Sequence, residues 1–346
     1  MYHTYTTILI PMLIAFASTV ITIRFLMPYM SGAGVYATDY NKKTRPKLPS
    51  GMGIAMSFGF AIGILAYIFG ASFSLYLPVV PITDLFAAVV ALLLISLVGF
   101  IDDINVRQSL TKTTGMMDTR VGLKQWQKPI LTLIGAVPLI AINAGVSIID
   151  IPFIGIVNIG ILYPLIVIPL AVIFAANSFN LLGGFNGIST LSGFIVSMAM
   201  LIYSILYGSA TGALLSGILV SILFAFSFYD GYPAKIIPGD SYTYAVGAAL
   251  VITMILGSME SFGVIVFMPW IIEFILHLKG KFNVTDLGKL QNDGTFKPPY
   301  GKRIFSWTHI IMNFKRSKEM DVTLTMGIIT FVFVILGFAL KIFGLL

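Results

Sequence analysis

The sequence predicts an all-α polytopic membrane protein with about ten transmembrane helices, and two observations lead to this fold class. Apolar residues make up 58% of the 346-residue chain and charged residues 10%, which is too few charges to solvate a globular surface. The chain also contains apolar runs of about 18 or more residues, long enough to cross a bilayer as helices. These runs lie at residues 6–28, 53–70, 84–101, 129–146, 159–177, 188–207, 211–228, 243–258, 261–278 and 322–344.

The distribution of lysine and arginine predicts how these helices are oriented. The even-numbered connections, near residues 71–83, 147–158, 208–211 and 259–260, contain no basic residue, whereas the odd-numbered ones hold most of them. By the positive-inside rule, the odd-numbered connections are cytoplasmic and both termini face outward. We therefore expect one transmembrane domain over residues 1–346, with cytoplasmic loops near residues 29–52, 102–128, 178–187, 229–242 and 279–321.

Residues that are absent or scattered exclude several kinds of chemistry. The chain has no cysteine and can form no disulfide, thiolate metal site or cysteine nucleophile. Its histidines, His3, His277 and His309, are far apart and lack metal-ligand spacing. The net charge of +7 would suit nucleic acid, anionic lipid or a phosphorylated substrate. Because the basic residues gather in loops on one side of a membrane, nucleic acid is not an expected partner.

Two adjacent carboxylates, Asp102 and Asp103, directly follow the apolar run 84–101. A carboxylate at the edge of the hydrocarbon is costly unless cations or hydrogen bonds compensate it, so the pair indicates a function. Neighbouring side chains on a helix point about 100° apart and cannot both face one ligand. We therefore expect one aspartate to work on a substrate and the other to hold a basic residue. The alternative is an ordinary acidic helix end in water.

Three more cytoplasmic segments are polar, and each has two interpretations. Residues 177–187 contain three asparagines and three glycines, which suit either a loop that binds a nucleotide and a hard cation or a tight reentrant turn. Asp240, at the start of a predicted helix, is either a functional carboxylate or a helix cap. The segment 39–53 is rich in lysine and arginine, which predicts either a phosphate contact or an anchor on anionic lipid headgroups.

The order and spacing of these segments form a more specific pattern than any one of them. The motifs are Asp39-x-Asn-Lys42 with Pro49, Gly-Phe-x-Asp102-Asp103, Asn177-Ser-x-Asn180-x-x-x-Gly-x-Asn186-Gly, Pro233-Ala-Lys235-x-x-x-Gly-Asp240-x-x-x-Tyr and Phe267-Met-Pro269. Together they resemble the polyprenyl-phosphate N-acetylhexosamine-1-phosphate transferase family. The resemblance is greatest to its archaeal and eukaryotic branch, which transfers N-acetylglucosamine 1-phosphate from its UDP derivative to dolichyl phosphate.

This resemblance implies an enzyme that releases UMP while forming a polyprenyl-diphospho-sugar, the first membrane step of lipid-linked oligosaccharide synthesis for N-glycosylation. The cofactor would be Mg²⁺, or Mn²⁺ in its place. Carried over position by position, the catalytic residues would be Asp102, Asp103 and Lys128, and the metal ligands Asn180 and Asp240. Phosphoryl transfer requires positioning and charge neutralisation more than covalent chemistry, so such a set is physically reasonable.

The same resemblance implies a nucleotide-sugar site made of several segments. From the matching motifs, its residues would be Asp39, Lys42, Gly184, Asn186 and Ile237. To these we add Lys279, Lys281 and Arg303, basic residues of a loop that departs from the family pattern. Ile237 stands where the family commonly has an aromatic residue that stacks on uracil. Either Lys279 and Lys281 or Arg303 would hold the diphosphate, although a headgroup-binding patch explains them equally well.

Departures from the family pattern limit the expected substrate. Gly184 and Asn186 replace the aspartates of the bacterial branch, and the last cytoplasmic loop lacks its histidine-rich motif, which argues against a muramyl-pentapeptide transferase.

The alternatives are a bacterial-type undecaprenyl-phosphate sugar-1-phosphate transferase, a secondary transporter, or a non-catalytic lipid-binding subunit. We expect an integral protein of an archaeal plasma membrane, whose partners are a UDP-N-acetylhexosamine, polyprenyl or dolichyl phosphate and membrane lipids; a homodimer is left open.

Overall fold

The computed structural model describes residues 7–104, 108–110, 117–120, 123–151 and 155–346, and most of this chain is helical. The helical segments are α2 (Leu9–Gly32), α3 (Gly53–Ser72), α4 (Ile82–Ile104), α5 (Gln127–Thr132), η1 (Leu133–Ala136), α6 (Val137–Ala141), η2 (Tyr163–Val167), α7 (Ile168–Asn180), α8 (Ile188–Tyr207), α9 (Ala210–Asp230), α10 (Asp240–Leu256), α11 (Glu260–Val266), α12 (Met268–Lys279), α13 (Trp307–Phe314) and α14 (Glu319–Ile342).

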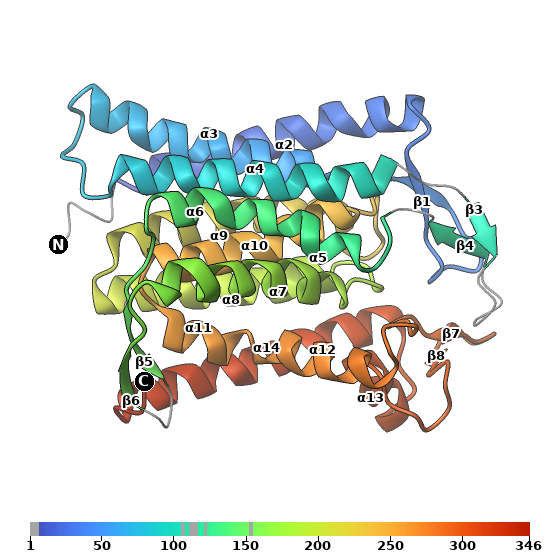
Figure 1. Ribbon diagram of the computed structural model, residues 1–346. Helices are drawn as coiled ribbons and strands as arrows, with labels where there is room; N and C mark the ends of the chain where they lie inside the picture. Colours follow the sequence, from blue (N-terminus) through green and yellow to red (C-terminus); the bar gives the residue numbers. More distant parts are fainter. Residues whose placement is uncertain (1–6, 105–107, 111–116, 121–122, 152–154) are drawn as a thin grey trace.

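Short antiparallel hairpins form parts of the connections between these helices. They pair β1 (Tyr36–Thr38) with β2 (Lys47–Pro49), β3 (Gln108–Leu110) with β4 (Met117–Arg120), β5 (Ile148–Ile151) with β6 (Gly155–Asn158), and β7 (Lys289–Leu290) with β8 (Phe296–Lys297). Figure 1 shows β1, the β3–β4 hairpin, β7, β8 and α13 at one end of the helix bundle, with the β5–β6 hairpin and the C-terminus at the other. The loops that carry the polar motifs therefore meet at one end, which we call the loop end.

In the described chain, seven helical segments are long and apolar enough to cross a membrane, or eight if the bent pair α11–α12 counts as one span. The protein is thus a polytopic membrane protein, but the count supported by length and composition is lower than the ten expected. The predicted spans 129–146 and 243–258 fall on shorter apolar helical stretches, Gln127–Ala141 and Asp240–Leu256.

Proline explains where two of the predicted spans are interrupted. The stretch from Gln127 to Ala141 divides into α5, η1 and α6, and Pro138 lies in the first turn of α6. The predicted span 261–278 divides between α11 and α12, which meet at a bend of 55° just before Pro269. A proline nitrogen cannot donate the helical hydrogen bond, and its ring clashes with the preceding turn, so proline is tolerated where a new helix starts.

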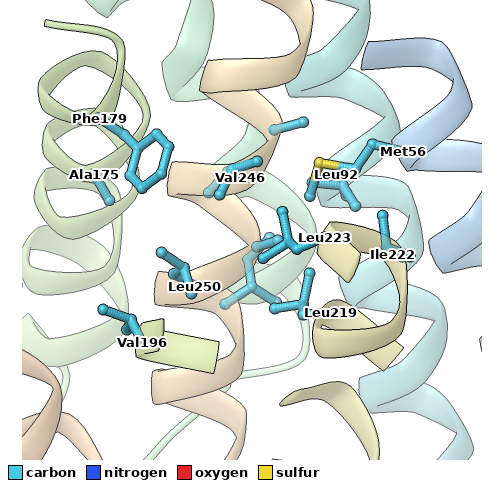
Figure 2. Packing of buried hydrophobic residues seen from close by; sticks show 14 of the residues in the cluster. Met56, Leu92, Ala175, Phe179, Val196, Leu219, Ile222, Leu223, Val246 and Leu250 are labelled. Atoms are coloured by element: carbon cyan, nitrogen blue, oxygen red, sulfur yellow. The ribbon is translucent and has the colours of Figure 1, made fainter. Parts of the chain in front are cut away.

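Helix α10 lies at the centre of the bundle. It contacts α3, α4, α7, α8 and α9, and nearly all of its residues are buried. Figure 2 shows Val246 and Leu250 of α10 among side chains from these neighbours, including Met56, Leu92, Phe179, Val196 and Leu223. In contrast, large apolar side chains on α2 and α14 are exposed, as expected for lipid-facing helices. The core therefore fixes the position of α10 and of the loop-end residue that starts it, Asp240.

Two glycines allow the N-terminus of α10 to lie against its neighbours. A Cβ atom on Gly53 of α3 would stand 2.2 Å from the carbonyl carbon of Ser241, and one on Gly99 of α4 would stand 2.5 Å from the Ser241 Cα. Neither separation is physically allowed, because packed atoms resist such overlap. Helices α3 and α4 can thus approach the backbone of α10 only where they lack a side chain.

Candidate active site

Asp103 binds the N-terminus of α10. Its carboxylate accepts hydrogen bonds from the backbone N–H of Asp240 (2.8 Å), the backbone N–H of Ser241 (3.0 Å) and the Ser241 hydroxyl (2.6 Å). A carboxylate here satisfies helix donors that lack partners and interacts favourably with the helix dipole. Asp103 is 2% exposed. Its contacts therefore place it as a structural link between α4 and α10.

Lys128 joins the other aspartate of the pair to Asp240. The Lys128 ammonium lies 2.7 Å from Asp102 Oδ2 and 3.0 Å from Asp240 Oδ2, so one cation bridges two carboxylates that come from α4 and α10. Asp102 also accepts a hydrogen bond from the backbone N–H of Leu123. The sequence-based expectation that one aspartate holds a basic residue thus describes Asp102, while its neighbour holds a helix end.

Asn180, the last residue of α7, faces the same cavity as this ion-pair cluster. Its Oδ1 accepts a hydrogen bond of 2.6 Å from the Thr243 hydroxyl on α10. The cavity has a volume of about 530 Å³, and its lining includes Asp102, Lys128, Asn180 and Asp240. One cavity at the loop end therefore brings together carboxylate, carboxamide and ammonium groups from four separate segments.

A second cavity of about 480 Å³ adjoins the first. It is lined by residues of the β1–β2 loop, including Asp39, and by Asp103. Both cavities share Gly183, Gly184, Asn186, Ile237 and Leu287. The nucleotide-site residues predicted from residues 177–187 and from the loop before Asp240 thus lie between the two cavities.

Lys42 lies beside this site and is already paired; in the described chain, neither cavity lining includes it. Its ammonium forms an ion pair with Glu319 of α14, stands 3.6 Å from Asp39 Oδ2, and lies 4.4 Å from the centre of the Tyr232 ring. Two carboxylates around one cation leave no excess positive charge at this point. The contacts describe Lys42 as a link between the β1–β2 loop and α14.

Lys279, Lys281 and Arg303 lie elsewhere. All three side chains are exposed, and in the part of the chain that the structure describes, neither cavity lining includes any of them. Exposed side chains of this length can move several ångströms, so their expected contact with a diphosphate remains a prediction.

Two acidic residues that the sequence did not single out belong to the site. Asp286, from the loop after α12, accepts hydrogen bonds from the backbone N–H of Gly183 (3.1 Å) and Gly184 (2.7 Å). Glu319 binds the same glycine loop further along, at the backbone N–H of Asn186. A signal existed for Glu319, since it is an acid at the edge of a predicted membrane span, as Asp102 is. Asp286 lies in a loop without a recognisable motif and had none.

Burial raises the pKa of Asp286 from 3.8 to about 6, against the lowering effect of the Gly184 and Gly183 amides. An acid whose pKa is raised on folding contributes stability that is present below about 4 and is lost as the pH rises through about 6. We therefore expect Asp286→Asn, which stays neutral and keeps an acceptor oxygen, to gain stability relative to the unmodified protein across this interval. Melting temperatures of both proteins at pH 4.5 and 7.5 would measure this.

A matched control for this experiment lies on the same loop. Asp293 is exposed, and hydrogen bonds from Thr295 lower its pKa, so Asp293→Asn should show no such gain with rising pH. An Asp286→Asn protein whose relative melting temperature falls as the pH rises would contradict the expected sign.

The fold and these cavities define a polytopic membrane protein with a charged, oxygen-rich site where its loops meet. The chain belongs to glycosyl transferase family 4, whose family model matches residues 85–258, from α4 to just beyond α10. This confirms the family resemblance drawn from the motifs.

Relatives from three organisms extend this similarity over most of the chain. A Saccharolobus solfataricus protein is 32% identical over 96% of this chain and 97% of its own length, and carries the provisional name UDP-N-acetylglucosamine–dolichyl-phosphate N-acetylglucosaminephosphotransferase. A Dictyostelium discoideum protein with that name, not provisional, is 24% identical over 73% of this chain and 67% of its own. A Clostridium botulinum phospho-N-acetylmuramoyl-pentapeptide-transferase is 30% identical over 72% of this chain and 71% of its own.

Proposed function

We propose that this protein transfers N-acetylglucosamine 1-phosphate, or a related N-acetylhexosamine 1-phosphate, from a UDP-sugar to dolichyl or another polyprenyl phosphate and releases UMP. The observation that carries the proposal is the cavity in which Lys128 bridges Asp102 and Asp240 beside Asn180. The name and nearly full-length similarity of the Saccharolobus relative support this choice of substrates. The reaction would be the first membrane step of lipid-linked oligosaccharide synthesis for N-glycosylation.

In the proposed reaction, an oxygen of the lipid phosphate attacks the β-phosphorus of the UDP-sugar. A new P–O bond forms to that phosphorus, and its bond to the oxygen bridging the α-phosphorus breaks, so that UMP leaves. The second pKa of a phosphate monoester is near 6, so the attacking group is already largely dianionic and needs no strong base. Asp102, which binds Lys128, is thus expected to orient that lysine rather than to remove a proton.

We propose that the cavity holds a Mg²⁺ ion through Asp240 and Asn180, which both line it. Among the described residues, no group of three or more histidine or acidic side chains is arranged to hold a metal. Mg²⁺ commonly takes one or two protein oxygens and completes its shell with substrate oxygens and water, so Asp240 and Asn180 would suffice. When bound, the ion neutralises charge on the diphosphate. Lys128, which lies between Asp102 and Asp240, neutralises part of the carboxylate charge on the same wall.

We also propose how the chain lies in its membrane. Counting the shorter apolar stretches Gln127–Ala141 and α10 as spans, together with the bent pair α11–α12, would restore ten helices, with both termini outside and the loop end in the cytoplasm. The absence of basic residues from the even-numbered connections supports this orientation. The protein would lie in the plasma membrane of an archaeal cell. The lipid acceptor would then reach the site through the bilayer, and the nucleotide would reach it from the cytosol.

An assay of the purified protein would test the proposal. We expect UMP to be released when a UDP-N-acetylhexosamine, polyprenyl phosphate and Mg²⁺ are all present, and release to stop when EDTA removes the metal. A panel with UDP-N-acetylglucosamine, UDP-N-acetylgalactosamine and UDP-N-acetylmuramoyl-pentapeptide would identify the sugar, the last because of the Clostridium relative. Absence of UMP release with every sugar and with both dolichyl and undecaprenyl phosphate would refute the enzyme assignment.

A further inference from the structure

Asn186, which lines both cavities, is held by three hydrogen bonds to other segments. Its backbone N–H donates to Glu319 Oε1 (3.2 Å), its backbone carbonyl accepts from the Thr323 hydroxyl (3.0 Å), and its Nδ2 donates to Asp39 Oδ2 (3.1 Å). Glu319 and Thr323 lie four residues apart on α14, so they face the same side of the helix. The first turns of α14 therefore clamp the peptide groups on both sides of this residue.

The contact with Asp39 also fixes which way the Asn186 carboxamide points. In this hydrogen bond Nδ2 is the donor and the Asp39 carboxylate the acceptor, so the amide nitrogen faces Asp39. The remaining group of the side chain is then Oδ1, an acceptor with lone pairs to offer a ligand. A fixed acceptor forms a hydrogen bond with a ligand that presents an N–H or O–H donor. A ligand that presents an acceptor at the same point leaves both groups without a partner, and this penalty is the stronger source of discrimination between the two ligands.

Glu319 contacts three residues around this site, Asn186, Lys42 and Asn41. It is 3% exposed, and besides Asn186 it contacts Lys42 through an ion pair and Asn41 Nδ2 at 3.4 Å. Asn41 in turn donates to the carbonyl of Gly184 at 2.6 Å. A buried carboxylate is costly unless it is fully paired, and these partners come from the β1–β2 loop and from the glycine loop. Glu319 thus joins both loops to α14.

We propose that Glu319 is a positioning residue that, by holding Asn186, makes the cavity select a pyrimidine with a ring N–H donor, namely uracil rather than cytosine. Uracil carries a hydrogen on its N3 atom between two carbonyls, whereas N3 of cytosine is an acceptor. The inference rests on the proposed function, because it assigns the uridine end of the substrate to Asn186. Glu319 itself touches no substrate; it acts through the position of the Asn186 backbone, while Asp39 orients the carboxamide.

Binding and turnover of variants in the full-length detergent-solubilised protein would test this role. For Glu319→Ala we expect the affinity for UDP, measured by calorimetry with Mg²⁺, to fall about tenfold, as for the loss of one oriented hydrogen bond. The preference for UDP over CDP should fall with it. The KM for the UDP-sugar should rise similarly, while the KM for polyprenyl phosphate stays unchanged. Glu319→Gln, whose carbonyl can still accept the Asn186 N–H, should recover part of the loss.

Two further variants keep the test decisive. Thr323→Val removes the second anchor of Asn186 without changing side-chain size and should weaken UDP binding in the same direction, even if Glu319→Ala does not fold. Asp321→Asn is the matched control, since Asp321 is exposed in the same turn of α14 and its carboxylate accepts a hydrogen bond from the backbone N–H of Lys318, outside the Asn186 contacts. It should leave both nucleotide affinities unchanged.

Three outcomes would overturn the inference. These are unchanged UDP binding in both Glu319→Ala and Thr323→Val, an equal loss of UDP and CDP binding, or an equal rise in the KM of both substrates. The last two would describe a residue that only stabilises the fold. Lack of UMP release by the unmodified protein would refute the proposed reaction instead, and the comparison of UDP with CDP binding would still decide the role of Glu319.

Discussion

Replacing Asp240 with asparagine is expected to lower UMP release at least about a thousandfold. The change keeps the size of the side chain but removes the charge that faces Lys128 at 3.0 Å and the expected carboxylate ligand of Mg²⁺. Removing one group that stabilises transition-state charge in an enzyme typically costs about 10²–10³ in kcat, and loss of the metal adds to this. The rate of UMP release at saturating substrates measures the effect.

The control for this prediction separates chemistry from folding. Asp321→Asn also neutralises an aspartate in the first turn of a helix, but Asp321 lies outside both cavity linings in the described chain, so its variant should remain active. The melting temperature of the Asp240→Asn protein should stay within a few degrees of the unmodified one. Near-normal UMP release by Asp240→Asn would remove Asp240 from the metal site.

Asp103→Ala is expected to reduce the free energy of unfolding by about 2–4 kcal/mol, the largest stability effect we predict. The substitution removes an acceptor shared by the N–H groups of Asp240 and Ser241 and by the Ser241 hydroxyl, and leaves the two Ser241 donors buried without it. Loss of a helix cap alone costs about 1 kcal/mol, and the remaining bonds account for the rest. Thermal and denaturant unfolding in detergent would measure the change.

A variant that removes only one of the Asp103 hydrogen bonds gives a smaller effect for comparison. Ser241→Ala removes only the hydroxyl from the Asp103 contacts and should cost about 1 kcal/mol. If Asp103→Ala unfolds like the unmodified protein while UMP release is lost, the carboxylate acts on the substrate and its contacts with α10 are incidental.

The sequence predicted the membrane class, the family and several of the residues that line the cavities, because these depend on local pattern. Apolar runs mark helices, and the motif residues Asp102, Asn180 and Asp240 end or begin such runs. Their meeting at one end of the bundle followed from the alternation of basic and non-basic connections. Each of these signals is readable within about 20 residues of the chain.

What the sequence could not supply are relations between distant segments. The adjacent aspartates divide their work because α10 starts next to one and α5 next to the other, and no spacing in the chain encodes that. Lys42 matched a phosphate-binding pattern, yet Glu319, 277 residues further along the chain, pairs with it. The count of ten spans is not confirmed by helix length for a different reason, since two of the predicted spans are divided into shorter helical segments near prolines.

The approach of α3 and α4 to the start of α10 has a consequence for how this site is mapped. The location of Asp240 depends on the hydrogens that Gly53 and Gly99 carry in place of a methyl group, although neither glycine belongs to a cavity lining in the described chain. An alanine at either position would displace the helix that carries the carboxylate. A mutational scan scored on turnover alone would therefore count Gly53 and Gly99, which have no functional group, among the residues of the active site.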